Sequence, residues 1–62
     1  MKYLKRSNFK DWYTLDYQSD NVLELVLKGE KEKSKANFTH YSISFYGSYY
    51  MLVCFYTKKG EN

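Results

Sequence analysis

Residues 38–57 read FTHYSISFYGSYYMLVCFYT, two runs rich in aromatic and β-branched residues that are separated by Gly47 and Ser48. Such runs favour β-strands, and a two-residue loop that begins with glycine is typical of a type II′ turn with positive φ at its first position. The sequence therefore predicts a β-hairpin. Its register places Tyr46 opposite Tyr49, followed by the pairs Ser44–Met51, Ser42–Val53 and His40–Phe55.

The two faces of this hairpin differ in polarity, because side chains alternate between the faces of a strand. One face is apolar on both strands and is predicted to be the core face: Tyr41, Ile43, Phe45, Tyr50, Leu52, Cys54 and Tyr56. The other face is polar on the first strand and apolar on the second. Its apolar stripe comprises Tyr49, Met51, Val53 and Phe55.

Residues 21–28 also alternate, with Leu23, Leu25 and Leu27 on one side. This pattern predicts a half-buried strand whose leucine side meets the core face of the hairpin. The segment 29–36 that follows alternates Lys and Glu after Gly29, and we expect it to be a polar loop.

The N-terminal third of the chain fits two structures. Asn8 could cap a helix over residues 9–17, with Phe9, Trp12, Tyr13 and Tyr17 on one stripe that covers the leucine side of the sheet. A strand is the alternative, since Tyr13, Leu15 and Tyr17 alternate. We therefore expect an α+β fold with one N-terminal helix packed on a three-stranded antiparallel sheet; the alternative is an all-β fold of four short antiparallel strands.

The length of 62 residues sets the domain count and argues against an enzyme. Residues 1–62 are expected to form a single small domain, which has little room for a ligand cleft. Cys54 and His40 are the only cysteine and histidine, so we expect no internal disulfide, no metal site and no cofactor. The hairpin register places these two residues on opposite faces, which argues against a catalytic pair. No catalytic residues are assigned.

The surplus of rings points instead to a binding surface. The chain has eight Tyr, four Phe and one Trp, more ring surface than a core of this size can bury. We predict that Tyr46, Tyr49, Met51, Val53 and Phe55 form a surface that binds a larger protein or joins two copies of the chain. The competing interpretation is that residues 1–6 or the helix fold over this stripe, or that the strand is central and the twist of the sheet hides part of it.

A basic, aromatic N-terminus supports a second function. Lys2, Lys5, Arg6 and Lys10 alternate with rings that include Trp12, a combination typical of proteins that grip single-stranded nucleic acid. The chain has a single Arg, which weighs against sequence-specific reading of bases. Non-specific nucleic-acid binding is therefore the alternative function, and a structural homodimer is a third.

The terminal sequences suggest where the protein acts. Residues 1–10 lack the apolar core of a secretory signal, and the longest apolar run, residues 49–56, is shorter than the roughly 20 residues that cross a bilayer. We expect a cytoplasmic protein without membrane contact. Its small size and its Lys- and Tyr-rich, proline-free composition suit an inhibitor or accessory factor encoded by a phage or another mobile element.

Overall fold

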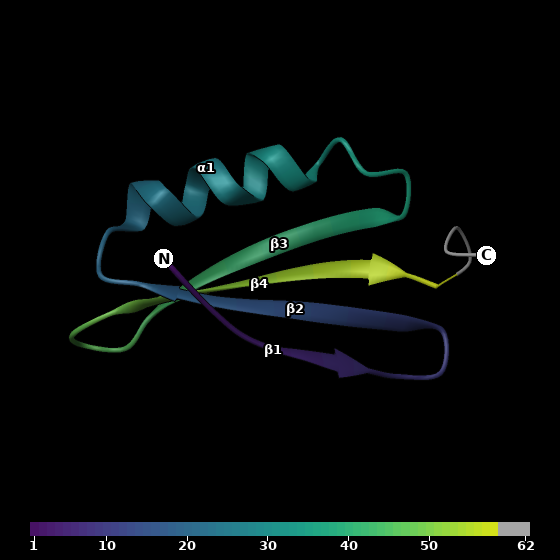
Figure 1. The fold of residues 1–62 in the computed structure, drawn as a ribbon, viewed down its shortest axis with the longest axis horizontal. Coiled ribbons are helices and arrows are strands. Elements are labelled where there is room, and N and C mark those ends of the chain that lie inside the picture. The colour runs from purple at the N-terminus through teal and green to yellow at the C-terminus, as the bar shows by residue number, and fades with distance from the viewer. Residues whose placement is uncertain (59–62) are drawn as a thin grey trace.

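The computed structural model describes residues 1–58, which form one helix and a four-stranded antiparallel sheet (Figure 1). The strand order across the sheet is β1-β2-β4-β3, so β2 and β4 are central and β1 and β3 are edges. The helix lies along one side of this sheet. The elements in chain order are β1 (Lys2–Asn8), β2 (Trp12–Ser19), α1 (Val22–Glu32), β3 (Phe38–Phe45) and β4 (Tyr50–Thr57).

The α+β class is confirmed, but the predicted order of elements is wrong. The sheet has four strands instead of three, and the helix lies in the middle of the chain. Residues 12–19, most of them expected in the N-terminal helix, form the central strand β2, which pairs with β1 on one side and with β4 on the other. The alternation of Tyr13, Leu15 and Tyr17 places all three on the side that α1 covers, and pairing on both edges stabilises this extended conformation.

The predicted strand over residues 21–28 is also wrong, because this segment begins the helix. Asn21 caps α1 by accepting a hydrogen bond from the amide of Leu23 at 3.0 Å, and Glu24 lies in the first turn. The helix continues through Gly29 and ends at Glu32, inside the expected loop. Within residues 1–58, no helix is both long and apolar enough to cross a membrane.

The helical period changes which leucines are buried. Leu25 faces the sheet and is fully buried, whereas Leu23 and Leu27 are 60% and 62% exposed. Gly29 allows the helix to approach β3 closely, since a Cβ at this position would lie 2.8 Å from the ring of Tyr41. The glycine therefore sets the distance between α1 and the sheet.

The C-terminal hairpin is confirmed with its predicted register. Ser44 pairs with Met51, Ser42 with Val53 and His40 with Phe55, and Gly47 has a φ of 87°. Next to the turn, the amide of Tyr46 donates to the carbonyl of Tyr49 at 2.8 Å.

Burial along the predicted core face of the hairpin is uneven. Leu52, Cys54 and Tyr56 on the central strand β4 are fully buried, and with Tyr13, Tyr17 and Leu25 they form the core. On the edge strand β3, Ile43 is half-buried and Phe45 is 60% exposed. The prediction that Phe45 belongs to the core is wrong, because this residue lies beside the turn at the end of an edge strand, beyond the cover of the helix.

Candidate functional site

The side of the sheet opposite α1 is formed by the alternate residues of all four strands, and we call it the helix-free face. Its direction follows from the strand register, because Tyr13, Leu52 and Tyr56 point to the helix and their sequence neighbours point away. On β2 and β4 the helix-free face comprises Trp12, Thr14, Asp16, Gln18, Met51, Val53, Phe55 and Thr57. On the two edges it comprises Lys2, Lys5, Ser7, His40, Ser42 and Ser44.

Four rings stack in a row across one end of this face. Phe9 stacks on Trp12 with ring centroids 4.1 Å apart, Trp12 lies 5.9 Å from Phe55, and Phe55 lies 4.2 Å from His40. The interplanar angles are 13°, 24° and 11°, so the rings are nearly parallel. Each inner ring has a neighbour on both sides, and only the outer faces of Phe9 and His40 have no neighbour within the row. We call these four residues the ring row.

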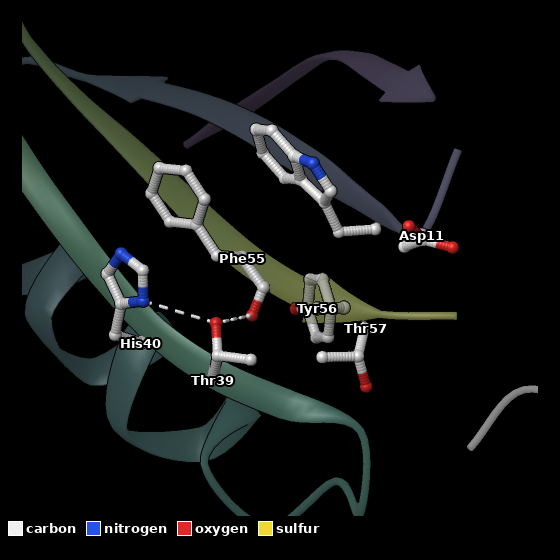
Figure 2. Close-up of a pocket in the computed structure, with 7 residues that line it drawn as sticks. Asp11, Thr39, His40, Phe55, Tyr56 and Thr57 are labelled. Carbon is white, nitrogen blue, oxygen red and sulfur yellow. Dashed lines mark hydrogen bonds between the residues drawn. The ribbon is translucent and has the colours of Figure 1, made fainter. Parts of the chain in front are cut away.

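A groove of about 580 Å³ lies at the same end of the sheet (Figure 2). Phe55 and Thr57 form its floor on β4, and Trp12 and His40 stand on the flanking strands. The remaining lining residues are Asp11, Thr39 and Tyr56. This volume falls within the roughly 300–1,000 Å³ of ligand pockets and exceeds what the short sequence led us to expect.

Hydrogen bonds fix the edge of the groove at β3, where the register shifts between Phe38 and His40. The hydroxyl of Thr39 donates to the carbonyl of Phe55 at 3.0 Å and lies 3.1 Å from Nδ1 of His40, as Figure 2 shows. Because that hydroxyl has a single proton, Nδ1 of a neutral His40 must donate to it. The remaining ring nitrogen, Nε2, is then an acceptor.

The predicted apolar stripe lies on the helix-free face. Met51, Val53 and Phe55 follow one another along β4 and are each half-buried, so the N-terminal segment does not fold over them and convert them to core. Tyr49 and Tyr46 stack beside the turn with centroids 5.5 Å apart. The stripe therefore runs from the turn to the ring row.

The predicted nucleic-acid residues do not share one surface. Lys2 and Lys5 lie on the helix-free face, opposite Gln18 and Asp16 of β2. Arg6 lies on the helix side, with its guanidinium 3.9 Å from the ring centre of Tyr13 and its Nε donating to Asn8. Lys10 is exposed in the turn between β1 and β2.

Asp16 is an acidic residue near the middle of the helix-free face. Its side chain is 9% exposed, and its Oδ1 has no hydrogen-bond partner among residues 1–58. Lys5 of β1 and Val53 of β4 are its register neighbours. Within the described part of the chain, Oδ1 is therefore a buried acceptor without a hydrogen bond.

Burial and hydrogen bonds shift the pKa values of three groups on the helix side: Cys54, Glu32 and Tyr56. Burial raises the pKa of the Cys54 thiol, which makes it a poor nucleophile. Burial also opposes ionisation of Glu32, but hydrogen bonds from Lys35, Tyr56 and Lys28 outweigh it and bring the pKa of Glu32 to about 2. The hydroxyl of Tyr56 donates a hydrogen bond to Glu32. The pKa of this hydroxyl is raised, mostly by burial and then by the hydrogen bond.

Cys54 and His40 lie on opposite faces of the sheet, as predicted. Among residues 1–58, no three His, Cys, Asp or Glu side chains are grouped closely enough to hold a metal ion.

Sequence reasoning misses two members of the ring row. The predicted helix places Phe9 and Trp12 over the core, yet they are 45% and 40% exposed on the opposite side of the sheet. The signal that could have found them is the alternation of Tyr13, Leu15 and Tyr17: if these three point to the core in a strand, Trp12 must point away. Comparison of the chain with protein-family models, curated proteins and solved structures finds no match.

Proposed function

We propose that this chain is a non-enzymatic binding protein whose helix-free face docks on a larger protein. The observation that carries the proposal is the ring row, which continues along β4 into Val53 and Met51. Surfaces rich in Trp, Phe, Tyr and Met and poor in Lys and Glu are typical of the centres of protein interfaces. The groove beside Trp12 would receive one apolar side chain of the partner.

The charges around this surface define the chemistry of the partner. Lys2 and Lys5 lie at the β1 margin of the helix-free face, and the chain carries a net charge of +3. The complementary surface has an apolar centre and acidic side chains beside β1.

The geometry of the rings favours a protein over a nucleic acid. Bases bind to single-strand platforms by stacking on free ring faces. Here Trp12 and Phe55 already stack on their neighbours, and Arg6 lies on the other side of the sheet, over Tyr13. Rings that already stack on one another suit an apolar protein surface better than a strand of bases.

A protein that acts by covering part of another protein is an inhibitor or an accessory factor. The small size and the Lys- and Tyr-rich, proline-free composition support an origin in a phage or another mobile element.

The test is a matched pair of charge substitutions. Val53→Lys places a charge in the middle of the helix-free face, and Leu27→Lys places the same charge on the exposed outer side of α1. Immobilised wild type and both variants are used to capture proteins from the host cell, and the captured partner is purified for calorimetry. We expect the Leu27→Lys variant to bind as the wild type does. The Val53→Lys variant should lose at least about tenfold in affinity, because the apolar contact of Val53 is lost and the partner must desolvate the new ammonium, even though Asp16 lies opposite it in the register.

Two outcomes would contradict the proposal. One is a folded Val53→Lys variant, judged by circular dichroism, that binds the purified partner as tightly as the wild type. The other is tight binding of a single-stranded oligonucleotide. The logarithm of its affinity would fall with the logarithm of the salt concentration, with a slope of about 0.7 per contacted phosphate. That second result, abolished by Lys2→Glu and Lys5→Glu, would make the protein a nucleic-acid binder.

A further inference from the structure

We propose that β3 is a pairing edge and that two copies of the chain join through it, β3 against β3, into one continuous eight-stranded sheet. This inference does not rest on the proposed function, because it concerns the edge of the sheet and not its helix-free face. It starts from a difference between the two edge strands.

The β1 edge is protected against pairing with another strand. Three of its seven residues are basic, Lys2, Lys5 and Arg6, and its pairing with β2 is interrupted by a register shift between Tyr3 and Lys5. Lysines and bulges are the devices by which edge strands avoid further pairing. The β1 strands of two copies would also repel each other, since both are basic.

The β3 edge has the opposite character. Its eight residues, FTHYSISF, include no Lys, Arg, Asp, Glu, Pro or Gly. The pairing of β3 with β4 also has a register shift, but it lies at the start of the strand, between Phe38 and His40. From His40 to Phe45 the pairing is uninterrupted, and β4 is the one neighbour of β3 in the described sheet. A long, uncharged edge of this kind is a template for another strand.

The hydrogen-bond pattern identifies the backbone groups that are available at this edge. The amide of Tyr46 donates to Tyr49, and in an antiparallel pair every second residue bonds to the same neighbour. Ser44, Ser42 and His40 therefore bond to β4. The amides and carbonyls of Tyr41, Ile43 and Phe45 point outward, in the plane of the sheet.

The helix leaves this edge accessible while it covers the adjoining face. The ring of Tyr41 packs under Gly29, and its hydroxyl donates to Glu30 at 2.7 Å. These contacts are made by the side chain above the sheet, whereas the outward backbone groups lie in the sheet. A strand added beside β3 would also cover part of Phe45, which is 60% exposed.

A second copy fits this edge because the sequence of β3 complements itself. A two-fold axis through Ser42 aligns residues 39–45 with the same residues of the second copy, brings the outward-pointing residues together, and keeps the register shift between Phe38 and His40 at the end of the overlap. Tyr41 then meets Ile43 on the helix side, and His40 meets Ser44 on the helix-free face. No like charges oppose each other, and self-association is a common means by which domains of this size gain stability.

Cross-linking at the axis tests this arrangement. Ser42 would face its own copy in a non-hydrogen-bonded pair, where Cα atoms are about 4.5 Å apart, within the range of a disulfide. We expect Ser42→Cys to form a covalent dimer under mild oxidation. The controls are Ser7→Cys on the β1 edge and the wild type, whose Cys54 is buried; neither should form a covalent dimer.

Charge substitution at the same position gives a reversible test. Ser42 is exposed, so Ser42→Lys and Ser42→Glu should both fold, as circular dichroism can verify. In sedimentation equilibrium the wild type should approach twice the mass of the single chain as concentration rises. Each variant alone should dimerise at least roughly fivefold more weakly, and an equimolar mixture of the two should restore association.

The proposal is overturned if the wild type stays a single chain at millimolar concentration. It is equally overturned if it dimerises but Val53→Lys, and not Ser42→Lys, dissociates it, since the copies would then meet through the helix-free face. Either outcome would overturn β3 pairing without deciding whether the helix-free face binds a partner. Calorimetry of the Val53→Lys variant with the purified partner tests that proposal separately.

Discussion

The two sides of β4 present the same kinds of residue to different surroundings. Leu52, Cys54 and Tyr56 point toward α1 and are fully buried. Met51, Val53 and Phe55 point away from it and are only half-buried. The comparison teaches that the helix divides the apolar residues of this strand between a buried core and a face left open to solvent, because α1 is a single element and can cover one side only.

The largest expected difference between the two sides is in stability. Leu52→Ala removes a side chain from the middle of the core and should lower the free energy of unfolding by about 2–5 kcal/mol. Val53→Ala, one residue away on the helix-free face, should cost about 1 kcal/mol or less. Urea unfolding of both variants measures the two costs. Equal costs would mean that the helix-free face is also core.

Acid should weaken the helix side selectively. The pKa of Glu32 is about 2 in the folded protein, against 4.5 when unperturbed, so its ionised form stabilises the fold above pH 4.5. That contribution, on the order of 2–3 kcal/mol, should disappear as the pH falls from about 4.5 to about 2. Urea unfolding across this range, followed by the helical circular dichroism signal, measures it.

Glu32→Gln provides the control for the acid experiment. It removes the titrating carboxylate and should flatten the dependence of stability on pH between about 2 and 4.5. Glu24 accepts a hydrogen bond from the N-terminus and Glu30 accepts one from Lys33, and each bond lowers the pKa of its carboxylate. Both carboxylates are exposed, so they should contribute less than Glu32 to the pH dependence of stability. A Glu32→Gln variant that keeps the full pH dependence would assign the effect to those residues.

The hairpin can be predicted from sequence because its signals are local. The glycine turn and the two alternating runs determine register without reference to the rest of the chain. The same register places Met51, Val53 and Phe55 on the face away from the core, where they are found. That part of the candidate site therefore follows from residues 38–57 alone.

The first half of the chain cannot be assigned in the same way, because each segment fits two periods. Phe9, Trp12 and Tyr13 match a helical stripe, and only the pairing of β2 between β1 and β4 selects the strand. Leu23, Leu25 and Leu27 match a strand, and the cap formed by Asn21 with Glu24 three residues later is the stronger local signal. The ring row depends on the first choice: the alternation of Tyr13, Leu15 and Tyr17 places Trp12 away from the core only if the strand is chosen over the helix.

The smallest expected effect concerns the turn before β4, which sets the register of that strand and so decides which residues lie on each of its sides. Gly47 has a φ of 87°, where a β-branched residue is strained, and no atom outside its immediate neighbours lies within 4 Å of the position its Cβ would take. Gly47→Val should therefore cost roughly 1–2 kcal/mol through backbone strain alone, without a steric clash. Ser48→Val, one position along, is the matched control and should cost less.

Strain at Gly47 and a slipped strand would have different consequences for β4. If the turn shifted the register by one residue, Met51 and Val53 would move to the helix side and Leu52 to the helix-free face. Thermal unfolding together with the solvent reactivity of Cys54 distinguishes the two results. A lower melting temperature with Cys54 still protected indicates strain, and a reactive Cys54 indicates a slipped strand. An unchanged melting temperature would contradict the positive φ at Gly47.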